Sequence, residues 1–430
     1  MTGRSPAVAR RPGATAVAGA AALSSMMVVS TWLASGAASG ASFLVPAAGD
    51  RLPGWMAGAF AGAGQTRGHG ALLVSVLVLG AGYAVVLACR PALPASVVIG
   101  GIVALHVIFL LAPPLLSGDV FSYIAYGRLG ALHGISPYRY GPDAAPHDPV
   151  LRYVAALWAH TPSAYGPLFT IPSYALGSLG IAAGLWGFKL LAAAAGLAVV
   201  AFVWRIAEAR GRDPVVAAAT VGLNPIFLIY AIGGAHNDLV MLAITMLGVL
   251  LACTRREAGG AAAVVAGAAV KASAAVVLPF LLLGGPQPRR AALGGLAAFA
   301  AIAALAVAVF RGSALGFASV LAHAHLVTSS SPGSDIMALI GRFPGRRPLG
   351  TGVAALVLAG LLWAVWRGAD WVAGAGWALL LAAGAGSAMF GWYTIWPLPF
   401  AILTSDRRLL WATLFIQVMF VAHLVPDVVA

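Results

Sequence analysis

Residues 291–310 read AALGGLAAFAAIAALAVAVF, a run without a charged or strongly polar side chain. About 20 apolar residues is the length of a helix that crosses the hydrocarbon core of a bilayer. In lipid every backbone polar group needs a partner, and the run is continuous and does not alternate, so it predicts a transmembrane α-helix. Comparable apolar runs occupy residues 71–88, 97–111, 190–203 and 239–252.

The composition of the chain agrees with this prediction. Of 430 residues, 61% are hydrophobic and 9% are charged, whereas soluble domains are about 25% charged. We therefore predict an all-α polytopic membrane protein, with residues 1–430 forming one transmembrane domain. The many Ala and Gly residues favour close packing of its helices.

The net charge of +13 does not indicate a nucleic-acid partner, because the basic residues are scattered singly and in short pairs. They indicate topology instead. Arg4, Arg10 and Arg11 precede the first apolar run and place the N-terminus in the cytoplasm. The run at 14–34 has features of a cleavable signal peptide, but we favour a retained helix, and the orientation is the same in both cases.

The positive-inside rule places Arg90 inside, so the third span, at 94–113, ends outside. Residues 114–182 are then a large outer loop with juxtamembrane helices. The rule allows only one crossing between this loop and Arg205, so residues 165–179, interrupted by Pro167 and Pro172, are expected to lie along the outer surface.

The same rule predicts the remaining topology. Residues 260–284 form a helical hairpin with Lys271 near its bend, and residues 311–348 form a second outer loop. A tight outer turn follows at 391–397. The total is roughly thirteen crossings in the plasma membrane. Cys89 and Cys253 fall at cytoplasmic span ends, so no structural disulfide is expected.

Ionisable and aromatic groups gather on the predicted outer side of the membrane. These residues are Asp119, Arg128, His133, Tyr138, Arg139, Asp143, His236, Asn237, Asp238, His323, His325 and Asp335. Such groups cost several kcal/mol beside the apolar slab unless they are paired, so their concentration on one face favours an active site.

Asp119 stands where the third span ends and a loop helix at 120–132 begins. One interpretation is a helix N-cap, because a carboxylate there accepts backbone N–H bonds. The other is a general base, because partial desolvation at the lipid boundary raises the pKa of a carboxyl group. Both interpretations can hold together.

Two further groups have a functional and a structural interpretation. Tyr123, Tyr126 and Gly130 share one helix face, which suits a sugar ring or an interfacial aromatic belt. His236 and Asp238 offer a proton carrier with an orienting carboxylate, or ligands for acceptor hydroxyls, while Asn237 could cap the next helix. No second pair of ligands accompanies them, so no metal is expected.

Two lysines fall within apolar segments. Lys271 is expected to need a partner, and a phosphate would supply one. Lys189 lies near the start of its span, where its side chain is expected to snorkel to the membrane surface.

An ordered set of motifs resembles a known family. The motifs are Gly118-Asp119-Val120-Phe121-Ser122-Tyr123, Ser136-Pro137-Tyr138, Tyr165-Gly166-Pro167-Leu168, Asn224-Pro225, Gly234-Ala235-His236-Asn237-Asp238 and Trp392-Tyr393. The set is similar to the actinobacterial polyprenol-phosphate-mannose-dependent α-(1→6)-mannosyltransferases, within the C-type superfamily of membrane glycosyltransferases. The resemblance covers residues 113–399.

The resemblance implies a bundle fold of the C-type and inverting transfer of mannose from a polyprenyl phosphate. The acceptor would be an α-(1→6)-mannan, a lipomannan-type glycan or a phosphatidylinositol mannoside at the outer face. Asp119 would be the base, and Lys271, Arg128 or Arg342 would offset charge on the departing phosphate. The remaining substrate-binding residues would be Tyr123, Tyr138, Tyr165, His236, Asn237, Asp238, Trp392 and Tyr393.

No cofactor beyond the lipid-linked sugar donor is expected, and membrane lipids are the other predicted partners. The closest alternative is an arabinosyl-type or other polyprenyl-phosphate-sugar glycosyltransferase. A transporter or lipid flippase is an alternative from another class, but it would place ionisable residues near the bilayer midplane rather than at one face. A scaffold without activity requires the outer polar groups to be dispersed in space.

Overall fold

A computed structural model describes residues 13–40, 44–45, 52–62, 68–314, 316, 347–385 and 390–422. Within these ranges the chain contains helices and no β-strand. The α-helices are α1 (Ala14–Ala37), α2 (His69–Cys89), α3 (Ala95–Leu111), α4 (Asp119–Ala131), α5 (Ala156–Ala159), α6 (Pro167–Ser178), α7 (Ile181–Ala209), α8 (Pro214–Gly222), α9 (Asp238–Cys253), α10 (Glu257–Ala268), α11 (Leu278–Gly284), α12 (Pro288–Phe310), α14 (Arg347–Trp366), α15 (Trp371–Ala385), α16 (Pro397–Ile402) and α17 (Arg407–Ala422).

Short helical segments join them. They are η2 (Gly54–Met56), η3 (Gly58–Phe60), η4 (Arg90–Ala92), η5 (Pro142–Ala144), η6 (Pro149–Tyr153), η7 (Phe227–Ile232), η8 (Ala272–Val277), η9 (Arg311–Ser313) and η11 (Gly391–Ile395). All are 3-10 helices except η7, which is a π-helix. A π-helical turn inside a helix frequently marks a functional site.

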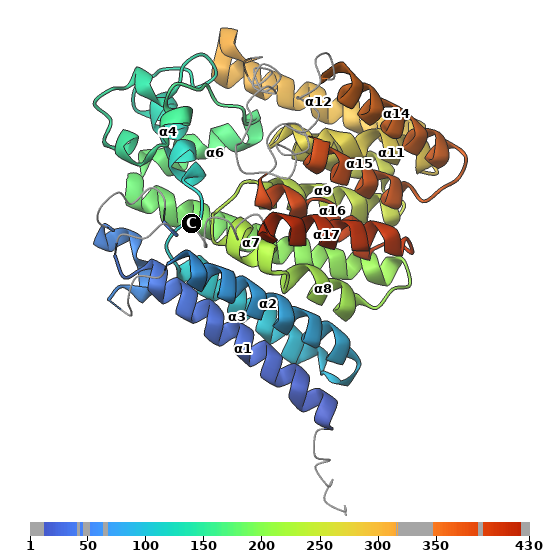
Figure 1. Ribbon diagram of the computed structural model, residues 1–430. Helices are drawn as coiled ribbons and strands as arrows, with labels where there is room; N and C mark the ends of the chain where they lie inside the picture. The colour runs from blue at the N-terminus through green and yellow to red at the C-terminus, as the bar shows by residue number, and fades with distance from the viewer. Residues whose placement is uncertain are drawn as a thin grey trace, which may run out of the picture.

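The helices form a layered bundle (Figure 1). Helices α1, α2 and α3 cover one side, α12 and α14 cover the opposite side, and α7, α8, α9, α16 and α17 lie between them. Helices α4 and α6 pack on each other at one end of the bundle, which we call the α4 end.

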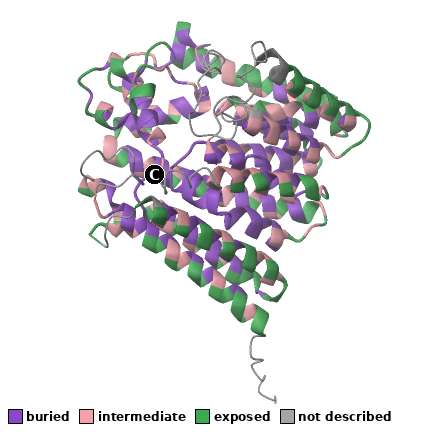
Figure 2. Cartoon of the chain, in the orientation of Figure 1, coloured by how far each residue is buried: buried purple, intermediate pink, exposed green. Residues whose placement is uncertain are grey.

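The bundle keeps apolar side chains on its outside as well as in its core. The central helices are largely buried, while the outer helices carry exposed residues along their length (Figure 2). On α12, Leu293, Leu296 and Phe299 are 67%, 64% and 60% exposed. Apolar side chains on the outside of a long apolar helix are expected when lipid is the solvent.

Four helical segments are long and apolar enough to cross a membrane: Ala14–Ala37, Gly70–Ala92, Ile181–Ala209 and Pro288–Ser313. Six shorter apolar helices accompany them among the described residues. The all-helical architecture is thereby confirmed for the described residues, with four candidate membrane spans, whereas the count of thirteen crossings stays a prediction.

Several local predictions can be compared with the structure. The loop helix at 120–132 is α4, and the bend of the 260–284 hairpin lies between α10 and η8, with Lys271 immediately before η8. The predicted interruption of 165–179 is wrong. Pro167 is the first residue of α6, a position that lacks a helical N–H partner in any case, and Pro172 lies inside the helix without ending it.

Two predictions concern the later outer segments. Residues 391–397 are not a simple turn, because they form η11 and the start of α16. Most of the predicted loop at 311–348 lies outside the described residues.

Connections that carry arginines meet at the other end of the bundle (Figure 1). A guanidinium nitrogen of Arg90 lies 3.4 Å from an Asp213 carboxylate oxygen. Arg210 bonds to Asp370 and donates from Nε to the Leu403 carbonyl at 2.9 Å. We call this the arginine end.

Candidate active site

Asp119 is the first residue of α4, at the α4 end of the bundle. The chain reaches it through Leu116, whose φ of 60° lies in the left-handed region that costs a non-glycine residue about 1–2 kcal/mol. The Ser117 hydroxyl accepts the Asp119 backbone N–H at 3.1 Å. The residue at the N-cap position is Gly118, and α4 has no side-chain cap. The capping interpretation of Asp119 is therefore wrong, and its carboxylate is available for another purpose.

His236 faces Asp119 from a different part of the chain. It follows η7 and the left-handed residue Ala235, whose φ is 56°. The imidazole stacks on Trp392, with 3.7 Å between ring centroids, and its Nδ1 lies 3.6 Å from Asp119 Oδ2. Among the described residues neither ring nitrogen has a hydrogen-bond partner. A buried imidazole whose two nitrogens lack partners is a candidate to hydrogen-bond a substrate hydroxyl.

Asp238 and Lys271 form a second unit of the cluster. Lys271 Nζ lies 2.8 and 2.9 Å from the two Asp238 carboxylate oxygens, and Trp396 donates its indole N–H to Asp238 at 2.7 Å. The ammonium also lies 4.5 Å from the centre of the Tyr393 ring. Lys271 therefore has a carboxylate partner in the chain, and Asp238 orients Lys271 rather than His236. Both findings correct the sequence-based expectation, which could not foresee that the hairpin bend meets the start of α9.

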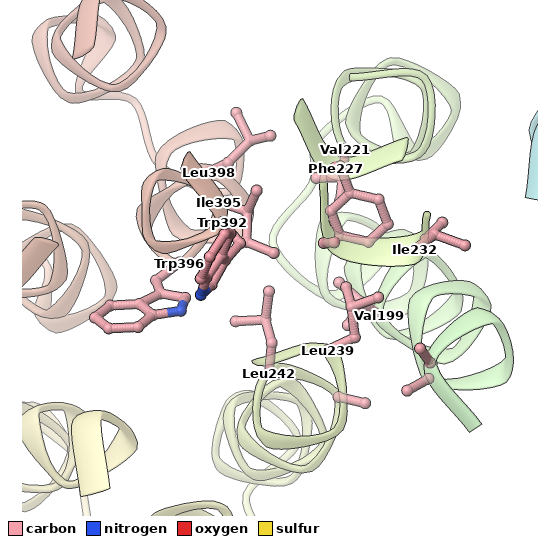
Figure 3. Close-up of a cluster of buried hydrophobic side chains, with 14 of the residues drawn as sticks. Val199, Val221, Phe227, Ile232, Leu239, Leu242, Trp392, Ile395, Trp396 and Leu398 are labelled. Atoms are coloured by element: carbon pink, nitrogen blue, oxygen red, sulfur yellow. The ribbon is translucent and has the colours of Figure 1, made fainter. Parts of the chain in front are cut away.

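The aromatic residues Trp392 and Trp396 are fixed by apolar packing. Figure 3 shows them against apolar side chains from several helices, among them Phe227 of η7 and Leu239 and Leu242 of α9. Trp392 is 8% exposed and Trp396 is 4% exposed. Tight packing restricts the rotamers of both rings and so orients the polar groups that they contact.

Tyr123 of α4 and Asn237, which precedes α9, contact each other at the edge of the cluster. The Tyr123 hydroxyl donates to Asn237 Oδ1 at 3.5 Å, and the Tyr123 ring makes an edge contact with Tyr165 at 5.1 Å between centroids. Asn237 is at the N-cap position of α9 but makes no capping bond, so that interpretation is wrong. Its side-chain nitrogen has no partner among the described residues. Tyr123 is 1% exposed and belongs to the floor of the cluster rather than to an open platform.

Three predicted binding residues lie elsewhere. Arg128 donates from Nε to both oxygens of Asp148, at 2.9 and 3.0 Å. The Tyr138 hydroxyl donates to the Tyr165 carbonyl at 3.0 Å and packs its ring on Phe310. Arg342 lies outside the described residues. The structure thus gives Arg128 and Tyr138 partners within the chain, and a role for them in binding stays a prediction.

The Arg128–Asp148 pair also includes His133, whose Nε2 lies 2.8 Å from Asp148 Oδ2. Burial favours the neutral Asp148 carboxyl, but the bonds from Arg128 and His133 outweigh it and hold the Asp148 pKa below its usual range. These bonds to Asp148, the N-cap residue of η6, connect α4 and the residues that follow it to η6.

Sequence reasoning missed Trp396, and it misjudged Lys189. Trp396 ends the aromatic motif at 391–397, so its position beside Trp392 and Tyr393 was the available signal. Lys189 was expected to reach the membrane surface, but its exposed fraction is 0%. It lies inside the bundle because that face of α7 packs on α3 and η7.

Burial of the carboxyl group makes Asp119 easier to protonate than an ordinary aspartate. Burial, with a smaller contribution from nearby Asp238, raises the pKa of Asp119 to about 6 against the opposing effect of Lys271. The described cluster holds two carboxylates and one ammonium, and of the cations that the resemblance assigned to the departing phosphate it contains Lys271 but not Arg128. Its one cation, Lys271, has three N–H groups, and Asp238 engages at most two of them.

An apolar cavity of about 310 Å³ lies beside the hairpin that carries Lys271. Its walls come from α10, η8, α11 and α12, and include Pro167, Val264, Val265, Ala268, Ala269, Ala275, Leu278, Phe299, Ile302, Ala303, Ala306, Val307 and Ala314. Gly166, which precedes the cavity residue Pro167, donates its N–H at 3.0 Å to the carbonyl of Val270, which precedes Lys271. A cavity lined in this way fits a hydrocarbon chain.

Within the part of the chain that the structure describes, no group of three or more His, Cys, Asp and Glu side chains could hold a metal ion. Independence from a divalent metal stays a prediction.

Comparison with known proteins identifies the family. Residues 16–284 match the family described as alpha-(1->6)-mannopyranosyltransferase, N-terminal domain. This chain belongs to that family. Residues 164–426 also match glycosyltransferase family 87. These matches confirm the family that the motifs of the sequence suggested.

Individual relatives agree with this assignment. Alpha-(1->6)-mannopyranosyltransferase A of Mycobacterium tuberculosis is 29% identical over 333 residues, which is 70% of this chain and 63% of the relative. Alpha-(1->6)-mannopyranosyltransferase A of Corynebacterium glutamicum is 32% identical over 157 residues, 36% of this chain and 31% of the relative. The chain thus covers less than two thirds of the length of each. No solved structure matches the chain.

Proposed function

We propose that this protein is an inverting mannosyltransferase of the plasma membrane. It transfers a mannosyl residue from a polyprenyl-phosphate mannose to an α-(1→6)-mannan, a lipomannan-type glycan or a phosphatidylinositol mannoside at the outer face. The observation that carries the proposal is the convergence of Asp119, His236 and the Asp238–Lys271 pair in a chain of this family.

In the proposed reaction the acceptor hydroxyl oxygen attacks C1 of the mannosyl group. The bond between C1 and the phosphate oxygen breaks, and its electron pair leaves with the polyprenyl phosphate. Asp119 takes the proton of the attacking hydroxyl. A carboxylate with a pKa of about 6 suits this role, because a general base works best when its pKa lies near the operating pH. A single displacement at C1 inverts the anomeric configuration.

Lys271 is the group best placed to receive the donor phosphate. Its bond to Asp238 fixes the ammonium in one position, and at least one N–H stays available. Charge that develops on the leaving oxygen is stabilised most by a donor that is oriented before the reaction begins.

The apolar cavity beside the hairpin is an argument for a donor that carries a lipid chain. Its lining includes Ala269, two residues before Lys271, and several residues of α12, a helix with exposed apolar side chains. A chain entering from the membrane between α10 and α12 would place its phosphate near the ammonium. A soluble nucleotide-sugar has no hydrocarbon chain that could fill this apolar cavity.

The test compares Asp119→Asn with Asp143→Asn in protein reconstituted into nanodiscs. Transfer from radiolabelled polyprenyl-phosphate mannose to an α-(1→6)-mannoside acceptor is measured together with donor binding. We expect Asp119→Asn to lose transfer by about 10²–10⁴-fold, the usual contribution of a general base, and to retain donor binding. Asp143, whose side chain is 45% exposed, should tolerate the change.

Retained turnover in Asp119→Asn would contradict the assignment of the base. Substrate flux across proteoliposomes that lack any acceptor would instead favour a transporter or flippase.

A further inference from the structure

Lys189 is buried in the middle of the bundle, on α7, and the mechanism above does not use it. Its Nζ donates to the Gly233 carbonyl at 3.1 Å and to the Pro113 carbonyl at 3.4 Å. Among the described side chains no carboxylate lies within ion-pair distance of it. A buried ammonium without a carboxylate is costly, so its presence calls for an explanation.

The two carbonyls explain how the ammonium is accommodated. Gly233 directly follows η7, and Pro113 lies two residues beyond the end of α3. The Gly233 carbonyl is at the C-terminal end of η7, where backbone carbonyls carry partial negative charge, and the Pro113 carbonyl belongs to the extended segment that follows α3. Lys189 therefore occupies the point where the end of η7 meets the segment that follows α3.

The same two carbonyls lead directly into the candidate active site. Pro113 lies three residues before the left-handed Leu116, which leads to Asp119. Gly233 lies two residues before the left-handed Ala235, which precedes His236. The Leu115 N–H also donates to the Gly233 carbonyl, at 3.0 Å, so the two segments are joined at this point.

We infer that Lys189 is a positioning residue, which holds the turns at 113–119 and 233–238 together and thereby sets the approach of His236 to Asp119. Without its ammonium the link between the turns reduces to the single Leu115–Gly233 bond. Left-handed residues persist only where the surrounding structure over-determines them. Losing one of the two links should therefore let both turns relax.

The test uses the full chain in nanodiscs with Lys189→Met, which keeps much of the side-chain volume, and Lys189→Arg, which keeps the charge. Arg205→Met is the matched control, because it removes an exposed cation from the same helix. The first readout is amide hydrogen exchange. In Lys189→Met we expect faster exchange of the amides at 115–119 and 233–237, including the Leu115 amide, with residues 242–253 of α9 and helix α12 unchanged.

The second readout is transfer activity, and only this arm rests on the proposed function. We expect kcat to fall about 100-fold in Lys189→Met, as for a displacement of about 1 Å at a reacting group, while KM for the donor changes little. Lys189→Arg should recover part of the loss. If the hydrogen-exchange change appears but Asp119→Asn remains active, the link stands and the proposed function fails.

Unchanged exchange in both turns would overturn the inference, as would unchanged kcat in an otherwise active protein. Faster exchange throughout the bundle would also overturn it, because Lys189 would then be a general core residue.

Discussion

The Asp119 carboxylate and the His236 imidazole lie 3.6 Å apart, slightly beyond hydrogen-bond range. The imidazole is held by its stacking on Trp392, and its Nδ1, which lies toward Asp119, has no hydrogen-bond partner among the described residues. The acceptor hydroxyl that Asp119 would deprotonate can therefore be positioned by His236 at the same time. A catalytic hydrogen bond commonly tightens only when the substrate is bound.

The raised pKa of Asp119 predicts a pH dependence of transfer. The base form is the carboxylate, which is lost as the pH falls through about 6. We expect kcat to be constant at neutral pH and to fall about tenfold per pH unit well below pH 6. An ordinary aspartate, with a pKa near 3.9, would place this decline about two units lower. Initial rates between pH 4.5 and 8 measure it.

Hydrogen exchange and thermal unfolding at each pH separate loss of the base from loss of structure. A rate that stays constant down to pH 5 in folded protein would show that Asp119 is not the titrating group, or that it is not buried in the active state.

At the scale of elements, glycines bring α4 and α6 into direct backbone contact. A Cβ at Gly127 would collide with the Ser173 carbonyl group, and a Cβ at Gly177 would lie 2.8 Å from the Arg128 backbone nitrogen. Close packing through small residues is how membrane helices associate without a hydrophobic driving force between them. Because α4 begins with Asp119, this contact helps to fix the position of the carboxylate.

Gly127→Ala is therefore expected to destabilise the protein. Alanine has the higher helix propensity, by roughly 0.5–1 kcal/mol, but the added methyl group forces α4 away from α6, and overpacking typically costs about 1–3 kcal/mol. We expect a lower thermal unfolding midpoint in detergent and reduced transfer.

Gly100→Ala is the matched control, because a Cβ at this position of α3 has no atom within 4 Å. Equal midpoints for the two variants would show that α4 and α6 can separate without loss of stability.

For the whole molecule, the two ends of the bundle differ in chemistry. The α4 end gathers the paired carboxylates, His236 and the aromatic residues of η11, while the arginine end gathers Arg90 and Arg210 with their partners. The positive-inside rule assigns the arginine end to the cytoplasm. On this basis we propose that the α4 end faces outward.

Cysteine labelling in intact cells tests this orientation. In a background with Cys89→Ser and Cys253→Ser, a membrane-impermeant maleimide should modify His147→Cys, which is exposed at the α4 end. It should modify Thr254→Cys, exposed at the arginine end, only after the membrane is permeabilised. The reverse pattern would place the cluster inside the cell.

The sequence by itself determined the class of the protein and named several residues that the structure brings together around Asp119. Apolar runs of membrane-spanning length leave lipid as the only solvent, and that conclusion needs no tertiary contact. The ordered motifs around Asp119, His236 and Trp392 predicted the family, and Lys271 was correctly placed at a bend. Each of these conclusions depends on local pattern, which one sequence contains.

Only the tertiary structure decided which polar groups face each other. In the structure Lys271 pairs with Asp238, and Asp119 lies beside His236. Arg128 pairs with Asp148. Lys189 is buried against the backbone carbonyls of Gly233 and Pro113. Lys271 lies at the bend between α10 and η8 and Asp238 begins α9, so their distance depends on how the hairpin packs against α9. The predicted roles of Asp119 and Asn237 as caps were wrong, because Ser117 accepts the Asp119 backbone N–H and Asn237 makes no capping bond.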